Sequence, residues 1–174
     1  YITKGRSHMS NIPTGFSEEE EEDDFQRAKY LTFLIQDKYY AFPIRDVKEI
    51  IEVQEITAVP EVPNYCKGII NLRGAIIPIV DVRLRFKLKE AEYTERTCIV
   101  VVMIGDVLIG FVVDTVDEVV DIDDENISPA PAIRADGSSK YITGVGKIDG
   151  KIIMLLDANK LLKEDDIAAM ASAC

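Results

Sequence analysis

The sequence predicts an all-β protein with short helices, in which two similar small barrels pack against each other. The first observation behind this prediction is an internal repeat. Its landmarks, with identical spacing in both copies, are Tyr65, Gly68, Gly74 and Asp81 and then Tyr141, Gly144, Gly150 and Asp157. The second observation is that apolar runs are short, β-branched and separated by turns, which is typical of small barrels. Copies this small are marginal alone, so we expect a shared apolar interface.

The upstream part of each copy repeats with a different shift. Residues 30–51 align with 99–120 at a shift of 69, whereas the later landmarks repeat at a shift of 76. The seven-residue difference fits best in the loop 132–139. We therefore predict a first barrel over 30–90 and a second over 97–162, with an exchange of strands between the barrels possible.

Each copy opens with a predicted hairpin. Two apolar runs surround a polar turn, as expected for antiparallel strands. The predicted strands are 30–35 and 39–44 in the first copy and 99–104 and 107–113 in the second.

Helical spacing of the apolar residues follows each hairpin. It covers 44–51 and 113–120 and predicts one short helix in each copy. Capping boxes that begin at Asp46 and Thr115 support both helices, because a Glu stands three residues later in each. The segments after these helices, 52–58 and 121–128, are predicted to be extended.

A second hairpin closes each copy. The predicted strands are 67–72 and 75–84 in the first copy and 143–148 and 151–156 in the second. Asp81 and Asp157 follow these strands and are expected to cap short helices at 82–86 and 158–162. A catalytic carboxylate dyad of the two acids is the alternative. A C-terminal helix is predicted over 161–173.

Residues 1–29 are predicted to lie outside the fold. Residues 1–9 have the pattern of a cloning remnant, and Glu18–Asp24 are seven consecutive acids that predict a solvated, disordered arm. A partner-binding acidic tail is the alternative for this arm. His8 is the only histidine, so without the remnant neither histidine catalysis nor a histidine metal site is expected.

Composition excludes further function classes. The net charge is −11 and no basic stripe is present, which argues against nucleic acid as a partner. No phosphate-binding loop is found, and the acidic stretch 121–126 lacks the glycine of a calcium loop. Three cysteines without Cys-x-x-Cys spacing indicate a reducing compartment. We therefore predict a cytoplasmic protein with no catalytic residues, no metal and no cofactor.

The most informative difference between the copies is a charge reversal at one turn. Arg73 of the first copy aligns with Asp149 of the second. The fold does not require this change, so Arg73 is either an exposed tip of arbitrary charge or a group that recognises a carboxylate or carbonyl of a partner.

The segment around Arg73 resembles the CheW family of bacterial chemotaxis coupling proteins. The block Asn71-Leu72-Arg73-Gly74 is the most specific part of this resemblance, which runs from about Tyr30 to Leu162. Further matching segments are 47–50, 62–70, 77–83, 110–114, 127–131 and 141–144. The resemblance implies two packed, five-stranded, SH3-like barrels.

It also implies a function without chemistry. The protein would be an adaptor that links the cytoplasmic tips of chemoreceptors to the histidine kinase CheA, through its regulatory domain, in arrays at the inner face of the membrane. The family positions implicated in partner contacts correspond to Val47, Glu49, Ile50, Asn71 and Arg73. Without the resemblance, Glu49 would be assigned to helix capping, and Val47 and Ile50 to the core.

Three other hypotheses stay open. The chain could be the coupling-like domain of a larger regulator, such as CheV or the CheA regulatory domain. A small-barrel nucleic-acid binder is disfavoured by the acidic charge and the absence of Trp. A carboxylate hydrolase would require Asp81 for activity.

Overall fold

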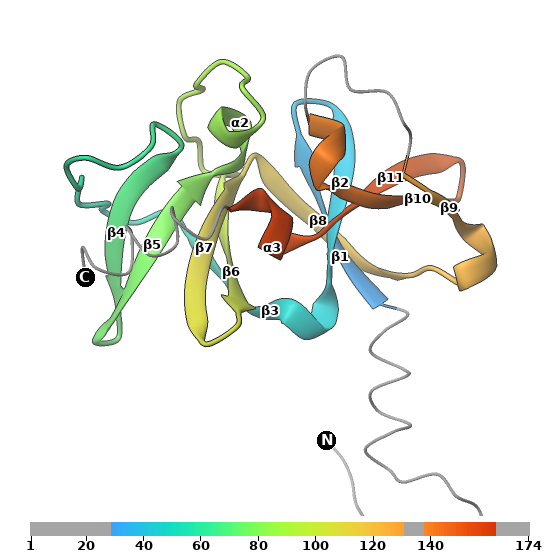
Figure 1. Cartoon of the computed structure of the whole chain (residues 1–174), viewed down its shortest axis with the longest axis horizontal. Helices are drawn as coiled ribbons and strands as arrows, with labels where there is room; N and C mark the ends of the chain where they lie inside the picture. Colours follow the sequence, from blue (N-terminus) through green and yellow to red (C-terminus); the bar gives the residue numbers. More distant parts are fainter. Residues whose placement is uncertain (1–28, 131–137, 163–174) are drawn as a thin grey trace, which may run out of the picture.

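The computed structural model describes residues 29–130 and 138–162, and these residues form two packed β-sheets with a few single-turn helices (Figure 1). The strands are β1 (Lys29–Ile35), β2 (Lys38–Pro43), β3 (Val47–Glu52), β4 (Cys66–Leu72), β5 (Ala75–Asp81), β6 (Cys98–Ile104), β7 (Val107–Val113), β8 (Thr115–Asp121), β9 (Ile127–Pro129), β10 (Ile142–Ile148) and β11 (Lys151–Leu156). The helices are α2 (Val82–Arg85) and α3 (Ala158–Leu161), and 3₁₀ turns lie at Ile44–Asp46, Asp124–Asn126 and Ser138–Tyr141. The predicted all-β fold class is confirmed.

All four predicted hairpins are present: β1–β2, β4–β5, β6–β7 and β10–β11. The two capping aspartates are also confirmed. The carboxylate of Asp81 accepts a hydrogen bond from the backbone N–H of Leu84, and that of Asp157 from Asn159. Residues 1–28, which include the acidic arm, lie outside the described residues. So do residues 163–174, which include most of the predicted C-terminal helix.

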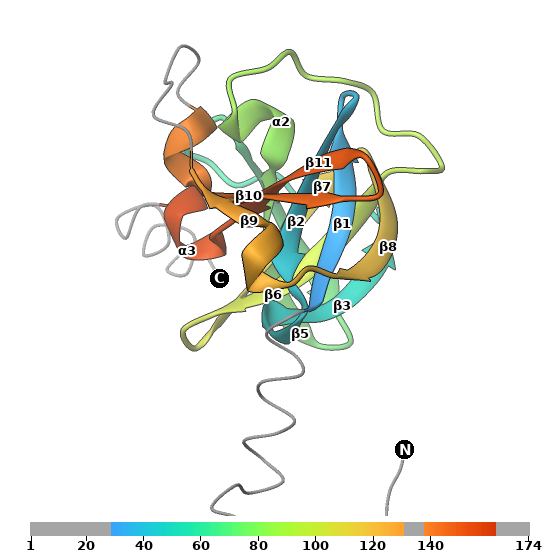
Figure 2. The same ribbon diagram turned by 90° about the vertical axis from the view of Figure 1, so that its right-hand side faces the viewer.

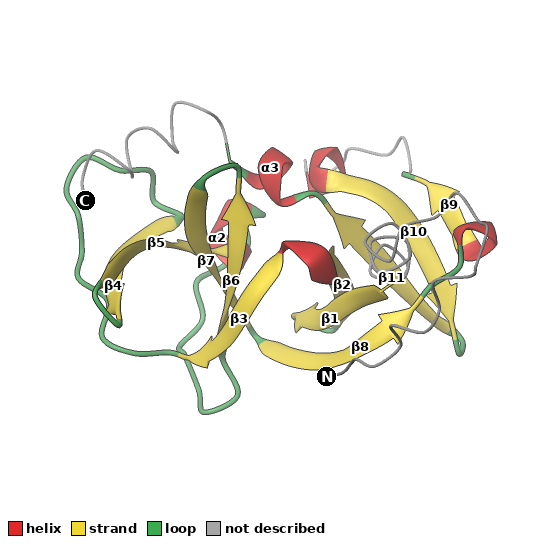
Figure 3. Cartoon of the chain, turned by 90° about the horizontal axis from the view of Figure 1, so that it is seen from below, coloured by secondary structure: helices red, strands yellow, loops and turns green. Residues whose placement is uncertain are grey.

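Each sheet combines strands from both halves of the sequence, as Figure 3 shows from below. The strand order is β3-β6-β7-β5-β4 in the five-stranded sheet and β8-β1-β2-β11-β10-β9 in the six-stranded sheet. Parallel pairs join the halves, with Ile79 opposite Gly110 in one sheet and Leu155 opposite Ala41 in the other. These two pairs are related by the sequence repeat. The ranges 30–90 and 97–162 describe the two copies of the repeat, whereas each sheet contains strands of both copies. The division of the chain into two barrels at these bounds stays a prediction.

The largest apolar cluster is shared by the two sheets, as the small size of each copy led us to expect. Phe42 of β2 and Phe111 of β7 occupy equivalent positions in the repeat, and their ring centroids lie 5.4 Å apart at the centre of this cluster. Each sheet also has a smaller cluster of its own, around Ile79 and around Leu155. The two barrels therefore depend on one another for burial of apolar surface.

The helices predicted over 44–51 and 113–120 are wrong. Only a 3₁₀ turn forms at Ile44–Asp46, and the rest is strand in both copies, so the predicted capping boxes do not exist. Strand β3 pairs with β6 through a bulge between Val47 and Glu49, and β8 pairs with β1 through a matching irregularity. The β-branched residues of both segments favour this outcome.

Two further features are the connection 86–97 and helix α3. The long connection between α2 and β6, residues 86–97, arches over α2 (Figure 2). Helix α3 lies where the two sheets meet, on one side of the molecule (Figures 1 and 2). None of the described helices has the length and apolar character needed to cross a bilayer.

Candidate partner-binding site

The turn between β4 and β5 carries Arg73 at an exposed hairpin tip. Arg73 and Gly74 both have positive φ, 51° and 92°, which is the geometry of a type I′ hairpin turn. The second copy has the same geometry at Asp149 and Gly150, with φ of 49° and 78°. The Asn71 side-chain carbonyl accepts a hydrogen bond of 2.8 Å from the Gly74 N–H. Asn71 therefore shapes the turn that presents Arg73.

The Arg73 side chain reaches across to strand β3 and pairs with Glu49. The Nη2 of Arg73 lies 2.5 Å from Oε1 of Glu49, and their side chains are 68% and 32% exposed. The hydrogen bond to Glu49, followed by the charge of that carboxylate, raises the pKa of Arg73. A guanidinium has five N–H donors, and this contact uses one of them. The remaining donors can bind a carboxylate or carbonyl of a partner.

An exposed aliphatic side chain completes this site. Ile76 of β5 is 41% exposed and lies opposite Asn71 in the hairpin. We call Glu49, Asn71, Arg73 and Ile76 the hairpin-tip cluster. Ile76 is absent from the sequence prediction because it lies in the apolar run 75–80, where spacing does not reveal which isoleucine faces water. The repeat offers a signal, since its counterpart Ile152 is 58% exposed.

The other two predicted site residues, Val47 and Ile50, both lie on strand β3 but differ in exposure. Val47 is half-buried and packs against the shared core, whereas Ile50 is 43% exposed. Ile50 follows Glu49 directly in a strand, so its side chain points to the opposite side from Glu49. Because β3 is an edge strand of its sheet, Ile50 remains available at an open edge. The structure thus brings Glu49 together with Arg73, at the turn that Asn71 shapes, whereas Ile50 points to the other side of β3 and Val47 packs against the core. The predicted capping role of Glu49 is wrong, because no helix forms there.

The six-stranded sheet carries a related arrangement. Glu118 corresponds to Glu49, and the Nζ of Lys151 lies 3.9 Å from its Oε2 and 3.8 Å from Oδ2 of Asp117. Lys151 also lies over the ring of Tyr39, 4.8 Å from the centroid. Tyr39, and after it Asp117, raises the pKa of Lys151. The β10–β11 hairpin therefore also places a cation next to the equivalent Glu, although the residue that aligns with Arg73 is Asp149.

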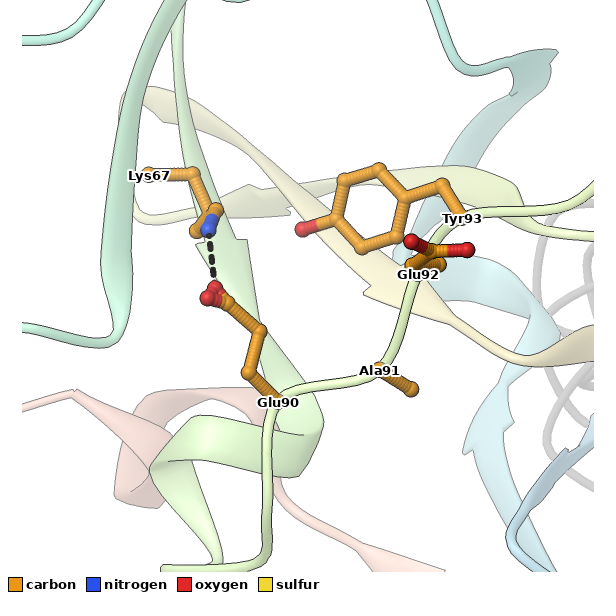
Figure 4. A pocket seen from close by; sticks show the side chains of 5 residues that line it. All are labelled: Lys67, Glu90, Ala91, Glu92 and Tyr93. Atoms are coloured by element: carbon orange, nitrogen blue, oxygen red, sulfur yellow. Dashed lines mark hydrogen bonds and ion pairs between the residues drawn. The ribbon is translucent and has the colours of Figure 1, made fainter.

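Figure 4 shows a surface pocket of about 470 Å³ beside β4. Two of its charged groups pair with each other: Nζ of Lys67 lies 3.0 Å from Oε2 of Glu90. The hydroxyl of Tyr93 donates to the buried carboxylate of Asp81 at 2.8 Å. Burial, and then this hydrogen bond, raises the pKa of Tyr93 far above its ordinary value. These contacts hold the connection 86–97 against the sheet, and Asp81 is engaged in capping and in this bond.

No group of three or more His, Cys, Asp or Glu side chains suited to a metal ion occurs within residues 29–130 and 138–162.

Comparison with known proteins gives consistent matches. The family model of the CheW-like domain matches residues 29–166. The chain is 34% identical to the chemotaxis protein CheW of Klebsiella aerogenes over 140 residues, which cover 80% of this chain and 84% of the relative. It is 34% identical to the chemotaxis protein CheW of Helicobacter pylori over 145 residues, covering 83% and 87%. The crystal structure of the scaffolding protein TtCheW from Thermoanaerobacter tengcongensis superposes with a TM-score of 0.74 at 32% identity, covering 80% of this chain and 95% of that one.

Proposed function

Because the chain belongs to the CheW-like domain family, we propose that it is a chemotaxis adaptor that couples the cytoplasmic tips of chemoreceptors to the histidine kinase CheA. A scaffold of this kind has no catalytic role; it controls the kinase by holding two partners in a fixed arrangement. It acts in the cytoplasm, recruited to receptor arrays at the inner face of the membrane. The names of its relatives and of its structural neighbour support the chemotaxis and scaffold parts of this proposal.

The observation that carries the proposal is the exposed ion pair of Glu49 and Arg73. The fold does not need a cation at this turn position, since Asp149 occupies the equivalent position with the same backbone conformation. Arg73 is 68% exposed, and the exposed aliphatic Ile76 lies opposite Asn71 in the same hairpin. Arginine with adjacent apolar surface is a common centre of binding energy in protein–protein interfaces.

A charge reversal at Arg73 tests this proposal. In Arg73→Glu, the side chain would repel both Glu49 and any partner carboxylate, so receptor-coupled CheA activity should fall at least about tenfold. The melting temperature should change by less than about 3 °C, because the side chain is exposed. The measurement is CheA autophosphorylation in reconstituted receptor complexes.

Lys147→Glu is the matched control. Lys147 is an exposed cation on the corresponding hairpin and aligns with Asn71, so it tests whether any charge reversal at a hairpin reduces activity. We expect its effect to be several-fold smaller. Full kinase activation by Arg73→Glu would show that the hairpin-tip cluster is not the recognition element.

A further inference from the structure

Helix α2 carries two arginines, one of which contacts the β7–β8 connection and the other helix α3. The first, Arg83, forms a two-fold contact with Asp114: Nε lies 2.7 Å from Oδ1, and Nη2 lies 2.6 Å from Oδ2. Asp114 is the single residue between β7 of the five-stranded sheet and β8 of the six-stranded sheet. Its Oδ2 also accepts a 2.7 Å hydrogen bond from the backbone N–H of Gln36, in the β1–β2 turn. One carboxylate therefore joins α2 to two elements of the other barrel.

The second arginine, Arg85, is buried, with only 7% exposure. Its Nε donates to the carbonyl oxygen of Leu161, the last residue of α3. Its guanidinium carbon lies 4.7 Å from the ring centroids of both Tyr65 and Tyr141. These tyrosines are equivalent in the repeat and belong to different copies. A cation at the carbonyl end of a helix and between two aromatic faces is held favourably.

The repeat shows that neither contact is a requirement of the fold. The counterparts of Arg83 and Arg85 are Asn159 and Leu161. At the other connection between the sheets, the Ile44–Asp46 turn, the position of Asp114 is taken by the exposed Arg45. The same fold thus forms on that side with a cation at the position of the Asp114 carboxylate.

The other connection carries a different set of charges. Burial raises the pKa of Asp46 in the Ile44–Asp46 turn; the positive charge of Arg45 lowers it and, to a smaller extent, the negative charge of Asp157 raises it. Asp46 therefore has a cation, Arg45, as well as the anion Asp157 near it, whereas Asp114 is bound directly by two nitrogens of Arg83. The bidentate contact is thus a feature of the β7–β8 connection.

We propose that Arg83 and Arg85 are positioning residues that clamp α2 to the other barrel and fix the angle between the two barrels. This inference rests on the proposed function, because an adaptor transmits a change between two partners only while its halves keep a fixed orientation. Loss of the clamp should loosen the angle while leaving the fold and each separate partner contact in place.

Asp114→Asn tests the clamp, because Asn keeps the shape of the side chain and removes its charge. Spin labels on exposed sites of the two sheets, at Asp106 and Lys147, report the distance between the barrels in a background with Cys66, Cys98 and Cys174 replaced. We expect the distance distribution of Asp114→Asn to be at least about twice as wide as that of the parent. The exchanged pair Arg83→Asp with Asp114→Arg restores the ion pair but not the acceptor for the Gln36 N–H, so it should narrow the distribution in part.

Circular dichroism confirms that each variant folds, and kinase assays add a functional readout. For Asp114→Asn we expect receptor-coupled CheA activity to fall about tenfold while the affinity for each single partner changes less than twofold. An unchanged distance distribution in Asp114→Asn, or no recovery in the folded exchanged pair, would overturn the clamp. If the parent itself supports no coupled kinase activity, the proposed function fails, and the distance measurement still decides on the clamp.

Discussion

At the scale of single residues, the two hairpin tips have an equivalent Glu, but the cation that pairs with this Glu comes from a different position in each copy. Glu49 and Glu118 are equivalent, but Arg73 comes from the turn itself, whereas Lys151 follows its turn. Alignment of the copies compares equivalent positions only, so the sequence predicted Arg73 and missed Lys151. The guanidinium is a planar, multi-donor group and the ammonium is a point charge, so the two tips suit different partner groups.

The site residues were predictable to different degrees. Arg73 was identified by its charge reversal, while the resemblance to the family identified Glu49 and Asn71. Their mutual contact could not be read from the sequence, because it depends on β3 lying against the β4–β5 tip. The partner-binding role of all five residues stays a prediction.

A pH-dependent stability effect is expected at Asp46. Its folded-state pKa is raised above the ordinary 3.8, chiefly by burial. Destabilisation by the charged form therefore appears as the pH rises through the folded pKa and is absent below about 3.8. Asp46→Asn should be more stable than the parent at pH 7, by at most about 0.5 kcal/mol because the carboxylate is still partly exposed to solvent. Urea denaturation at pH 7 and at pH 3.5 measures the difference.

Asp106→Asn, in the exposed β6–β7 turn, is the control for removing one negative charge from an acidic protein. It should show a smaller gain at pH 7. A gain for Asp46→Asn that is as large at pH 3.5 as at pH 7 would contradict the assignment.

At the scale of elements, the hairpins were predictable and the segments after them were not. In β3, Ile50 is apolar yet exposed, and Glu49 is acidic yet half-buried beside Arg73. These two residues break the alternation that identifies a strand, and the remaining apolar residues then resemble a helix in spacing. The prediction thus failed where an exposed apolar residue and a half-buried acid interrupt the alternation.

The glycines at the β4 and β10 bulges make a matched pair of tests. Gly68 has a φ of 138°, and a Cβ placed on it would lie 2.0 Å from the backbone oxygen of Thr57. A Cβ on its counterpart Gly144 would meet its nearest atoms at 3.0 Å and 3.1 Å. Gly68→Ala should therefore cost more than about 2 kcal/mol of unfolding free energy, and Gly144→Ala about 1 kcal/mol. Denaturant titration of both variants gives the comparison, and equal losses would contradict the close approach of the Thr57 backbone to β4.

At the scale of the whole molecule, the duplication was predictable, but which strands share a sheet was not. A repeat reveals which segments are alike and not which copy each segment pairs with. The connections decide this. Only Asp114 separates β7 from β8, which is too short for a hairpin, so β8 passes to the other sheet.

This exchange joins the barrels into one mechanical unit. Both crossings, the shared core around Phe42 and Phe111, and the arginines of α2 connect the two halves. Two partners that bind different parts of such a unit are held in a defined relative orientation. The central claim is therefore that one chain binds both partners at the same time.

Retention of the CheA regulatory domain on an immobilised receptor-tip fragment tests this claim most directly. With the chain present, the kinase domain should be retained in proportion to the chain that is bound; with the chain omitted, retention should fall to background. If the receptor fragment instead displaces the kinase domain from the chain, so that the two partners exclude each other, the adaptor account is contradicted.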